Sequence, residues 1–213
     1  MTLFRTLSVF CCALLLNQTS ASNESRPEPD NLILPLDYTL DSSGGSARQL
    51  RVRKVIGQTE HWLEKIWQEG REEIYVSGYA YHDPHTYSAE KRASLNNYAV
   101  GGGYGRTIAS ERGNEHSLYA LAFIDSHKNF QPNIGYAYQA IWGDRVRFGA
   151  GASVLIARRR DVFEGVPFPA IMPLFSIGTE NTSIMFVPIP KLSNSQNANN
   201  GNVLFVFGKF AYK

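Results

Sequence analysis

Eight strand-length segments follow one another along most of the chain after residue 72, and this repetition constrains the fold more than any other feature. Most of the segments alternate with a period of two and are rich in Tyr, Phe, Val, Ile and Gly, as half-buried β-strands are. In the last segment, Leu204, Val206, Phe210 and Tyr212 would share one face. The predicted strands are 73–82, 96–109, 116–125, 132–142, 146–157, 170–179, 182–190 and 202–212.

The connections between these segments alternate in length. The first connection and those near 158–169 and 191–201 are long, whereas SERGNE, GDR and EN are short. An even strand count with this alternation is typical of an outer-membrane barrel, whose short turns face the periplasm. A soluble lipocalin-like barrel is the rival, but it has less reason to carry aromatic residues outside. We therefore predict an all-β fold, an eight-stranded antiparallel transmembrane β-barrel.

The N-terminus has the pattern of a secretory signal peptide, which we expect to cover residues 1–21. Arg5 precedes an apolar run that is too short to span a membrane, and small residues follow around Ala21. Both cysteines, Cys11 and Cys12, lie inside this segment. The mature chain would then lack cysteine, which suits a bacterial envelope protein better than a secreted eukaryotic domain.

Two further segments precede the strands. Residues 22–55 are rich in Pro, Asp, Ser, Gly and Arg without a sustained period, so we expect a flexible extension. The stretch GQTEHWLEKIWQEG, 57–70, predicts an amphipathic helix with Thr59 as its cap. Its apolar face carries Trp62, Leu63, Ile66 and Trp67. Such a helix either packs on its own domain or lies at a membrane surface. Helix and barrel together form the predicted domain 56–213.

Composition and motifs exclude several functions. The formal net charge of +2, without a basic face interleaved with aromatic residues, argues against nucleic acid as a partner. No cluster of His, Cys, Asp and Glu has metal-ligand spacing, so we expect no metal site. GGGYG, 101–105, sits inside a predicted strand with no helix after it. It therefore indicates close packing in the barrel wall rather than dinucleotide binding.

The tripeptide Asp125–Ser126–His127 contains the residue types of a serine hydrolase triad. In an extended chain, however, neighbouring side chains point to opposite faces, so three consecutive residues do not converge easily on one atom. The same residue types also cluster where a strand gives way to a turn. The tripeptide alone therefore favours a polar strand end over a local triad.

From about Gly57 to Tyr212 the chain resembles the lipid A palmitoyltransferases of the bacterial outer membrane, the PagP family. The resemblance is carried by HWLEKIWQ, NNYAVGGGYGR, SLYALAFIDS, IGYAYQAIW, VPFPAIMPLFSIG and NNGNVLF. It implies transfer of a palmitoyl or similar saturated chain from the sn-1 position of a phospholipid, the acyl donor, to lipid A of lipopolysaccharide, the acceptor. It also implies a monomer in the bacterial outer membrane that needs no cofactor and confers resistance to cationic peptides.

The resemblance also implies the catalytic residues. They match His82, at the outer end of the first predicted strand, and Asp125 and Ser126, at the outer end of the third. His82 is expected to act as the base, and Ser126 as nucleophile or oxyanion donor. Asp125 would orient His82 or its partner. Acyl-enzyme and direct transfer both stay open, and His127 matches no catalytic position of the family.

Ala137 matches the floor of the family's acyl pocket, where a glycine is often found. One extra methyl raises that floor, so we expect a preferred chain at or slightly below the length of palmitate, with ordinary wall packing as the alternative.

Pro173 and Pro190 match prolines of the family's sixth and seventh strands. They predict a lateral gate for lipid, because proline cannot donate to the ladder. Ser77 and Ala99 replace the family's second pair of prolines, so a second gate has less support. The run Arg158–Arg160 either meets lipid A phosphates or forms a solvated loop.

Two other functions remain open. In a phospholipase-like hydrolase, water would replace the lipid A hydroxyl and the same residues would serve. In a non-catalytic small barrel, such as an adhesin or ligand carrier, His82, Asp125 and Ser126 would be polar groups at the rim.

Overall fold

The computed structural model describes residues 45–160, 163–191 and 201–212. The predicted signal peptide and residues 22–44 of the predicted extension lie outside the described residues. The chain divides into two units, Met1–Glu69 and Gly70–Lys213.

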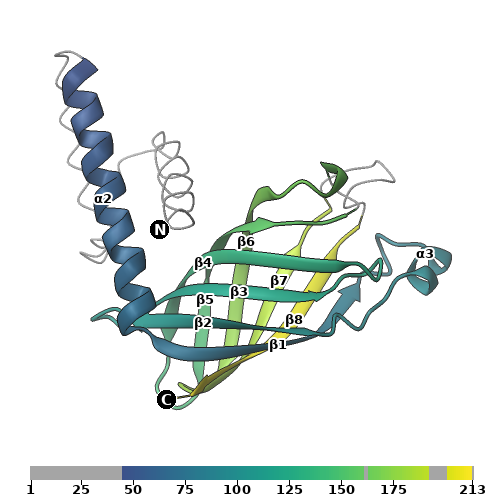
Figure 1. Ribbon diagram of the computed structural model, residues 1–213. Helices are drawn as coiled ribbons and strands as arrows, with labels where there is room; N and C mark the ends of the chain where they lie inside the picture. The colour runs from purple at the N-terminus through teal and green to yellow at the C-terminus, as the bar shows by residue number, and fades with distance from the viewer. Residues whose placement is uncertain (1–44, 161–162, 192–200, 213) are drawn as a thin grey trace, which may run out of the picture. The chain divides into compact units, whose positions relative to one another are not determined.

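The described part of the first unit is one helix, α2, Gly45–Glu69 (Figure 1). It ends before Gly70 as predicted, but it begins at Gly45 rather than Gly57, so its first part replaces the end of the predicted flexible extension. Thr59 therefore lies inside the helix, and its predicted role as a cap is wrong. Residues 45–56 lack a sustained apolar period, yet they contain several Arg, Leu, Gln and Lys residues and no proline, which favours a helix.

Among the described residues, no helix combines the length and the apolar character that crossing a membrane requires.

The second unit is a closed antiparallel barrel of eight strands, which confirms the predicted fold (Figure 1). The strands pair in sequence order, and β1 closes the barrel by pairing with β8. Their bounds are β1 Arg71–His82, β2 Gly101–Ala109, β3 Glu115–Ile124, β4 Phe130–Trp142, β5 Arg147–Ala157, β6 Phe168–Gly178, β7 Thr182–Ile189 and β8 Val203–Tyr212. The largest departure from prediction is β2, which begins at Gly101 rather than at residue 96.

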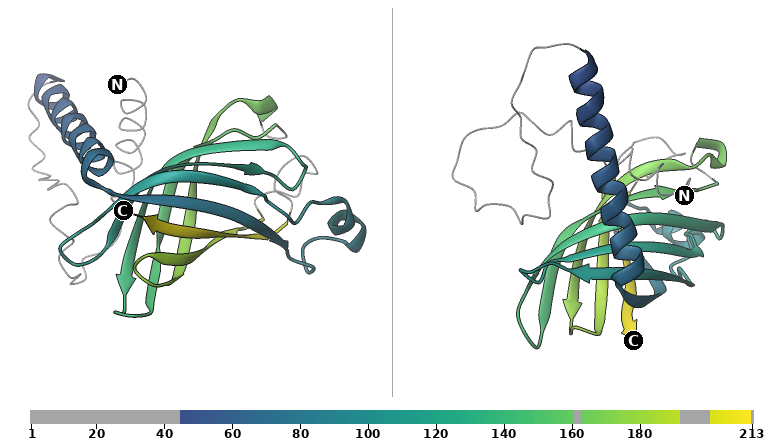
Figure 2. Two further views of the ribbon diagram at one scale, coloured as in Figure 1. Left: turned by 60° about the horizontal axis from the view of Figure 1, so that its bottom comes forward. Right: turned by 60° about the vertical axis from the view of Figure 1, so that its left-hand side comes forward.

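The two ends of the barrel differ. Short turns follow β2, β4 and β6 at one end, here the turn end, where β8 also finishes. The connections after β1, β3, β5 and β7 form the other end, here the rim. They carry two short helices, α3 (Ala89–Ser94) and the 3-10 helix η1 (Phe163–Gly165). Figures 1 and 2 show α3 at the rim, opposite the end of β8.

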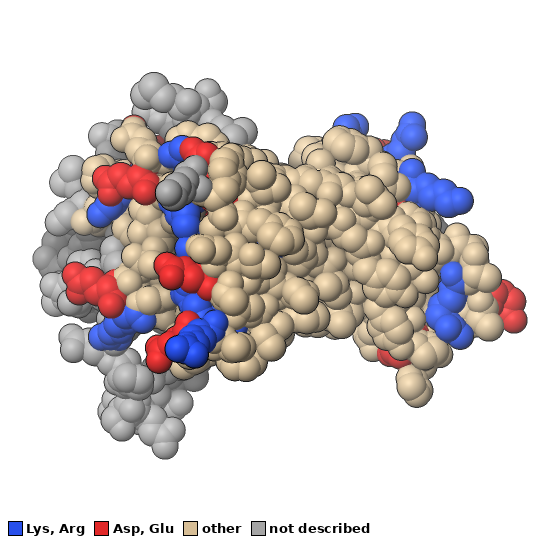
Figure 3. Space-filling model, turned by 90° about the horizontal axis from the view of Figure 1, so that it is seen from below, with Lys and Arg blue, Asp and Glu red and all other residues tan. Residues whose placement is uncertain are grey.

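Side chains of the wall alternate between an interior core and an exposed outer surface. Tyr75, Leu121 and Phe205 point inward and are buried, whereas Val76, Phe148 and Ile184 point outward and are exposed. Charged side chains gather toward the two ends of the molecule on the face in Figure 3, with a wide uncharged band between them. An apolar outer band is what a barrel wall facing hydrocarbon requires.

The glycines of β2 allow close packing of the wall, as predicted. A Cβ atom on Gly101 would lie 2.1 Å from the carbonyl oxygen of Ala122, and one on Gly103 would lie 2.3 Å from that of Ala120. Real side chains do not tolerate such contacts, so β2 and β3 approach as they do only because these positions lack a side chain.

Pairing between adjacent strands is irregular toward the rim at two places, between β6 and β7 and between β1 and β2. The β6–β7 ladder has four residue pairs and ends at Phe175 opposite Phe186. Continuing that register would place Pro173 opposite Pro188, and neither residue has an N–H to donate.

Between β1 and β2 the ladder ends at Ser77 opposite Gly101, but the wall is still bridged above this pair. The hydroxyl of Ser77 donates to the carbonyl of Ala99, and the Ala80 N–H donates to the carbonyl of Asn97 at 2.8 Å.

Candidate active site

His82 and Ser126 meet at the rim. His82 is the last residue of β1 and is only 4% exposed, and Ser126 follows β3. The Nε2 atom of His82 lies 2.9 Å from the Oγ atom of Ser126. On the other side of the ring, Nδ1 lies 2.8 Å from Oδ1 of Asn97. Three segments far apart in sequence therefore form one hydrogen-bonded row, which we call the Asn97–His82–Ser126 row.

Backbone hydrogen bonds hold these three segments together. Residues 95–100 connect α3 to β2 without strand conformation, and they lie between β1 and the end of β3. The Asn96 N–H donates to the carbonyl of Ser126 at 2.8 Å, while the carbonyl of Asn97 accepts from Ala80 on β1. The row is thus fixed by main-chain contacts and does not depend on flexible side chains alone.

Asp125 shapes the turn that carries Ser126. Its Oδ1 atom accepts the backbone N–H of His127 at 2.9 Å and that of Asn129 at 2.8 Å. Its Oδ2 atom is buried and has no hydrogen-bond partner among the described residues. Among these residues, no hydrogen bond joins Asp125 to His82, and the two hydrogen bonds of the carboxylate go to the turn that carries Ser126.

Tyr87 supports the imidazole from the connection after β1. Its ring meets that of His82 edge-on, with centroids 5.4 Å apart and planes at 84°. The phenol donates to the carbonyl of Gly201 at 3.4 Å. Burial raises the pKa of the Tyr87 phenol above its ordinary value, so it stays protonated and keeps this role as donor.

Asp83 ties the same connection to the segment before β8. It accepts from the backbone N–H and the ring of His85, and these hydrogen bonds, the backbone one first, hold the pKa of its carboxyl below the ordinary value. Asn202 donates to the other carboxylate oxygen at 3.2 Å. The wall of the rim beside His82 is therefore cross-linked by polar contacts.

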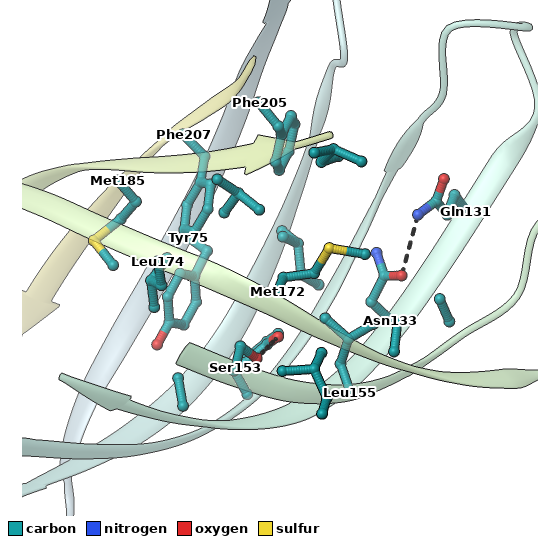
Figure 4. Close-up of a pocket in the computed structure, with 18 of the residues that line it drawn as sticks. Tyr75, Gln131, Asn133, Ser153, Leu155, Met172, Leu174, Met185, Phe205 and Phe207 are labelled. Atoms are coloured by element: carbon teal, nitrogen blue, oxygen red, sulfur yellow. Dashed lines mark hydrogen bonds between the residues drawn. The ribbon is translucent and has the colours of Figure 1, made fainter. Parts of the chain in front are cut away.

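A largely apolar cavity of about 480 Å³ occupies the barrel interior (Figure 4). Figure 4 shows Phe205 and Phe207 of β8 facing it together with Tyr75, Leu155, Met172, Leu174 and Met185, which come from four other strands. Gln131 and Asn133, hydrogen-bonded to each other at 3.2 Å, add polar groups on β4 toward the rim. The cavity lies within the range of volumes that small-molecule sites occupy.

The cavity becomes polar toward the turn end. Lys209 lines it and reaches two buried carboxylates, Glu115 at 2.6 Å and Glu73 at 3.4 Å. Glu73 also accepts from Thr107 at 2.7 Å and from Tyr75 at 3.0 Å. We call this group the polar floor. An aliphatic chain gains nothing by displacing such hydrogen bonds, so the floor limits how deep it inserts.

Ala137 lies where the lining changes character. It is buried, lines the cavity, and pairs with Ser117 on β3 and Ser153 on β5. The next inward residue of β4 toward the turn end is Gln139, which also lines the cavity. The predicted pocket-floor residue therefore sits directly above the polar layer.

An aromatic pair separates the cavity from the row at the rim. Phe123 of β3 and Phe205 of β8 stack with centroids 4.7 Å apart, and both line the cavity. Phe205 pairs with Ala80, two residues before His82, and Phe123 precedes Asp125 by two residues. None of the three predicted catalytic residues lines the cavity. A chain that joins cavity and row therefore has to pass this pair.

The cavity also reaches the part of the wall where β6 and β7 no longer pair with each other, called here the unpaired part. Ile171 and Met172 of β6 line it, and so do Val187 and Ile189 of β7, all beyond the last β6–β7 pair. Pro173 lies in this unpaired part of β6, and Pro190 directly follows β7. The two predicted gate prolines thus flank the same interruption of the ladder.

The arginines of the β5–β6 connection do not all face solvent. Arg159 lines the cavity on its rim side, and Arg158 donates to the carbonyl of Gly165 at 2.9 Å.

In the part of the chain that the structure describes, no group of three or more His, Cys, Asp or Glu side chains is placed to hold a metal ion.

Sequence reasoning missed three contributors to this region, namely Asn97, Tyr87 and Pro188. Asn97 was assigned to a strand, and no local pattern marks its contact with His82, fifteen residues away. Tyr87 lies in a connection without periodicity. Pro188 does carry a signal, since a proline inside a predicted strand marks an edge.

Comparisons with known proteins agree with this architecture. The family described as antimicrobial peptide resistance and lipid A acylation protein PagP matches residues 62–209. A lipid A acyltransferase PagP from Legionella longbeachae serogroup 1 (strain NSW150) is 42% identical over 202 residues, 92% of this chain and 84% of the relative. Proteins of the same name from Legionella pneumophila and Bordetella pertussis (strain Tohama I) are also similar. They are 38% identical over 172 residues, 80% of this chain and 88% of the relative, and 40% identical over 152 residues, 70% and 81%, respectively.

The matched segment contains strands β1 to β7, most of β8 and all three residues of the Asn97–His82–Ser126 row. The chain belongs to the PagP family of antimicrobial peptide resistance and lipid A acylation proteins.

Proposed function

We propose that this protein is an outer-membrane acyltransferase that moves a palmitoyl or similar saturated chain from the sn-1 position of a phospholipid to lipid A. The observation that carries the proposal is the 2.9 Å contact between His82 Nε2 and Ser126 Oγ at the rim, above a largely apolar cavity. The relatives named lipid A acyltransferase supply the acceptor. The phospholipid donor is what the family resemblance implies, and the cavity suits one saturated chain.

His82 acts as the base and Ser126 as the nucleophile in this proposal, because the Ser126 hydroxyl lies within hydrogen-bond distance of the Nε2 atom of His82. The Oγ atom bonds to the carbonyl carbon of the sn-1 ester while Nε2 takes the hydroxyl proton. The ester C–O bond then breaks, and the departing lysophospholipid oxygen takes that proton from His82.

Lipid A accepts the chain in the second half of the reaction. A hydroxyl oxygen of lipid A attacks the acyl-serine as His82 takes its proton. The bond to Oγ breaks, and the proton returns to Ser126. In direct transfer, the alternative route, the lipid A hydroxyl oxygen attacks the sn-1 ester carbon while His82 takes its proton and Ser126 donates to the oxyanion. The ester C–O bond then breaks, and the lysophospholipid oxygen takes the proton from His82. Intact mass measurement with donor but without acceptor separates them, because only the first route adds one acyl group to Ser126.

Lipid would enter sideways from the membrane. Beyond their last mutual pair, β6 and β7 both contribute residues to the cavity lining, and the uncharged outer band suits a hydrocarbon environment. We therefore place the protein in the bacterial outer membrane, with the rim toward the lipid A leaflet. A single chain contains both row and cavity, so a monomer suffices.

Mass spectrometry of lipid A from cells with and without the protein tests the function. We expect one additional acyl chain on lipid A, absent with His82→Ala or Ser126→Ala although both variants still form barrels. His127→Ala is the matched control, since it removes the neighbouring histidine but keeps the backbone N–H that Asp125 accepts. This variant should acylate lipid A normally.

Other products would identify the rival functions. Lysophospholipid and free fatty acid without acylated lipid A would indicate a hydrolase. No change in any lipid would indicate a non-catalytic barrel, and it would overturn the proposal.

A further inference from the structure

We infer that Asn97 is a positioning residue that fixes the tautomer of His82. The catalytic consequence rests on the proposed acyl transfer, whereas the tautomer itself does not. The amide of Asn97 comes from the segment before β2, and its Oδ1 atom lies 2.8 Å from Nδ1 of His82. This contact lies on the side of the ring opposite Ser126.

The chemistry of the two partners decides which ring nitrogen carries the proton. The Oδ1 atom of an amide accepts hydrogen bonds and cannot donate one, so Nδ1 has to carry the hydrogen. A neutral imidazole has only one N–H, and the other nitrogen, Nε2, then has a free lone pair. That lone pair faces the Ser126 hydroxyl at 2.9 Å, which donates to it.

This arrangement is the one that a base requires. With the opposite tautomer, an N–H would point at Ser126 and the ring would have no means to take its proton. In Ser-His-Asp hydrolases, a substitution that leaves the histidine in the wrong tautomer lowers kcat by about 10⁴-fold. Asn97 supplies by a neutral amide the orientation that a carboxylate supplies there.

The structure also explains why Asn97 holds its place. Its carbonyl accepts the Ala80 N–H of β1 at 2.8 Å. The adjacent Asn96 N–H donates to the Ser126 carbonyl. These backbone contacts remain when the side chain changes, so a side-chain variant removes the contact to Nδ1 without removing the segment from the rim.

Nitrogen NMR of isotope-labelled histidine in the full-length barrel tests the tautomer directly, at about pH 8, where an ordinary histidine is neutral. His82→Gln assigns the signal. We expect an Nδ1–H tautomer in the unmodified protein and in Asn97→Asp, whose carboxylate accepts the same hydrogen bond. In Asn97→Leu, which is similar in size but has no acceptor, this preference should be lost.

Acyl transfer measured on the same samples gives the catalytic consequence. Asn97→Leu should lose between about 10²-fold and 10⁴-fold of kcat, the range that general base catalysis contributes, and Asn97→Asp should recover most of it. Asn96→Leu is the control. It removes a neighbouring amide whose side-chain bonds go to Tyr98, so the tautomer should stay unchanged.

The outcomes distinguish this inference from the proposed function. An Nε2–H tautomer in the unmodified protein, or one that Asn97→Leu leaves unaltered in a folded barrel, overturns the inference. An Nδ1–H tautomer that depends on Asn97 in a protein without acyltransferase activity supports the inference and rejects the proposed function. Loss of the tautomer without loss of kcat overturns the positioning role.

Discussion

Ala137 stands, as a single residue, between the apolar part of the cavity and its polar floor. Replacing it with glycine removes one methyl group from the wall at the level of Ser117 and Ser153. We expect the preferred acyl chain to lengthen by about one carbon, since each buried methylene contributes about 0.8 kcal/mol. Acyl transfer measured against a series of saturated donors gives the optimum directly.

Ala140→Gly is the matched control for Ala137→Gly. Ala140 lies on the same strand but does not line the cavity. Both substitutions share the cost of a glycine in a strand, about 0.5–1 kcal/mol. An optimum that moves in neither variant means that Ala137 is ordinary wall packing.

Asp125 combines a structural contact and a buried charge, and one substitution separates them. Asp125→Asn keeps an Oδ1 acceptor for the two turn N–H groups, but it removes the charge on the unpartnered Oδ2. We expect the free energy of unfolding to stay within about 1–3 kcal/mol of that of the unmodified protein, because the amide nitrogen that replaces Oδ2 is itself a buried polar group without a partner. Activity should fall at least about 10-fold, because a buried carboxylate oxygen without a hydrogen-bond partner is typical of a functional group.

Asp125→Ala loses both contributions, so it should be less stable than Asp125→Asn and no more active. Chemical unfolding of the barrel in detergent and acyl transfer measured on the same samples provide the two readouts. If Asp125→Asn kept full activity, the carboxylate would serve the turn alone.

Of the residues predicted for this site, the structure brings His82 and Ser126 together, and their catalytic roles stay predictions. His82 and Ser126 were identified through a family resemblance and then met at hydrogen-bond distance, although 44 residues separate them. Asn97 gave no such signal because its role depends on a contact across two segments. Within the tripeptide Asp125–Ser126–His127, His127 donates its backbone N–H to Asp125, whereas the histidine beside Ser126 is His82.

The decisive element is the incomplete β6–β7 ladder. Cysteines at Met172 and Ile189, one on each strand beyond the last pair, allow a short reducible cross-linker to close the gap. We expect acyl transfer to fall at least about 10-fold on cross-linking and to recover on reduction, because the lipid chain then has no lateral path. Activity assays before and after reduction measure this effect.

A second cysteine pair, at Phe175 and Phe186, provides the matched control. These residues already face each other in the ladder, so joining them leaves the gap toward the rim unchanged. Equal loss of activity in both cross-linked proteins would show that general stiffening, and not closure of the gap, causes the effect.

The elements themselves were largely predictable because a half-buried strand has a period of two. Errors arose where tertiary contacts replaced that period. Residues 96–100 look like strand, but their hydrogen bonds go to Ala80, Ser77 and Ser126 across a bend near Gly78, where the β1–β8 register shifts. The start of α2 was missed for the opposite reason, since its first residues favour helix without an apolar period.

For the barrel as a whole, the two ends have different tasks. The rim carries the Asn97–His82–Ser126 row, and the interior near the turn end carries the polar floor. Between them the interior is largely apolar, and the outer face seen in Figure 3 is uncharged. This polarity suits an enzyme whose substrates lie in a membrane, with chemistry at one interface and the acyl chain measured from that interface inward.

A pair of arginine substitutions tests whether the barrel spans a membrane. Val76, in the middle of β1, and Val146, in the short turn before β5, are similarly exposed, at 51% and 54%. In a barrel that spans a bilayer, Val76→Arg should cost about 2–4 kcal/mol and Val146→Arg about 0–1 kcal/mol, because the cost of a lipid-facing arginine depends on depth. Reversible denaturant unfolding in phospholipid vesicles gives both values. A soluble barrel would expose both positions to water, and the two costs would then be equally small, which would contradict the membrane assignment.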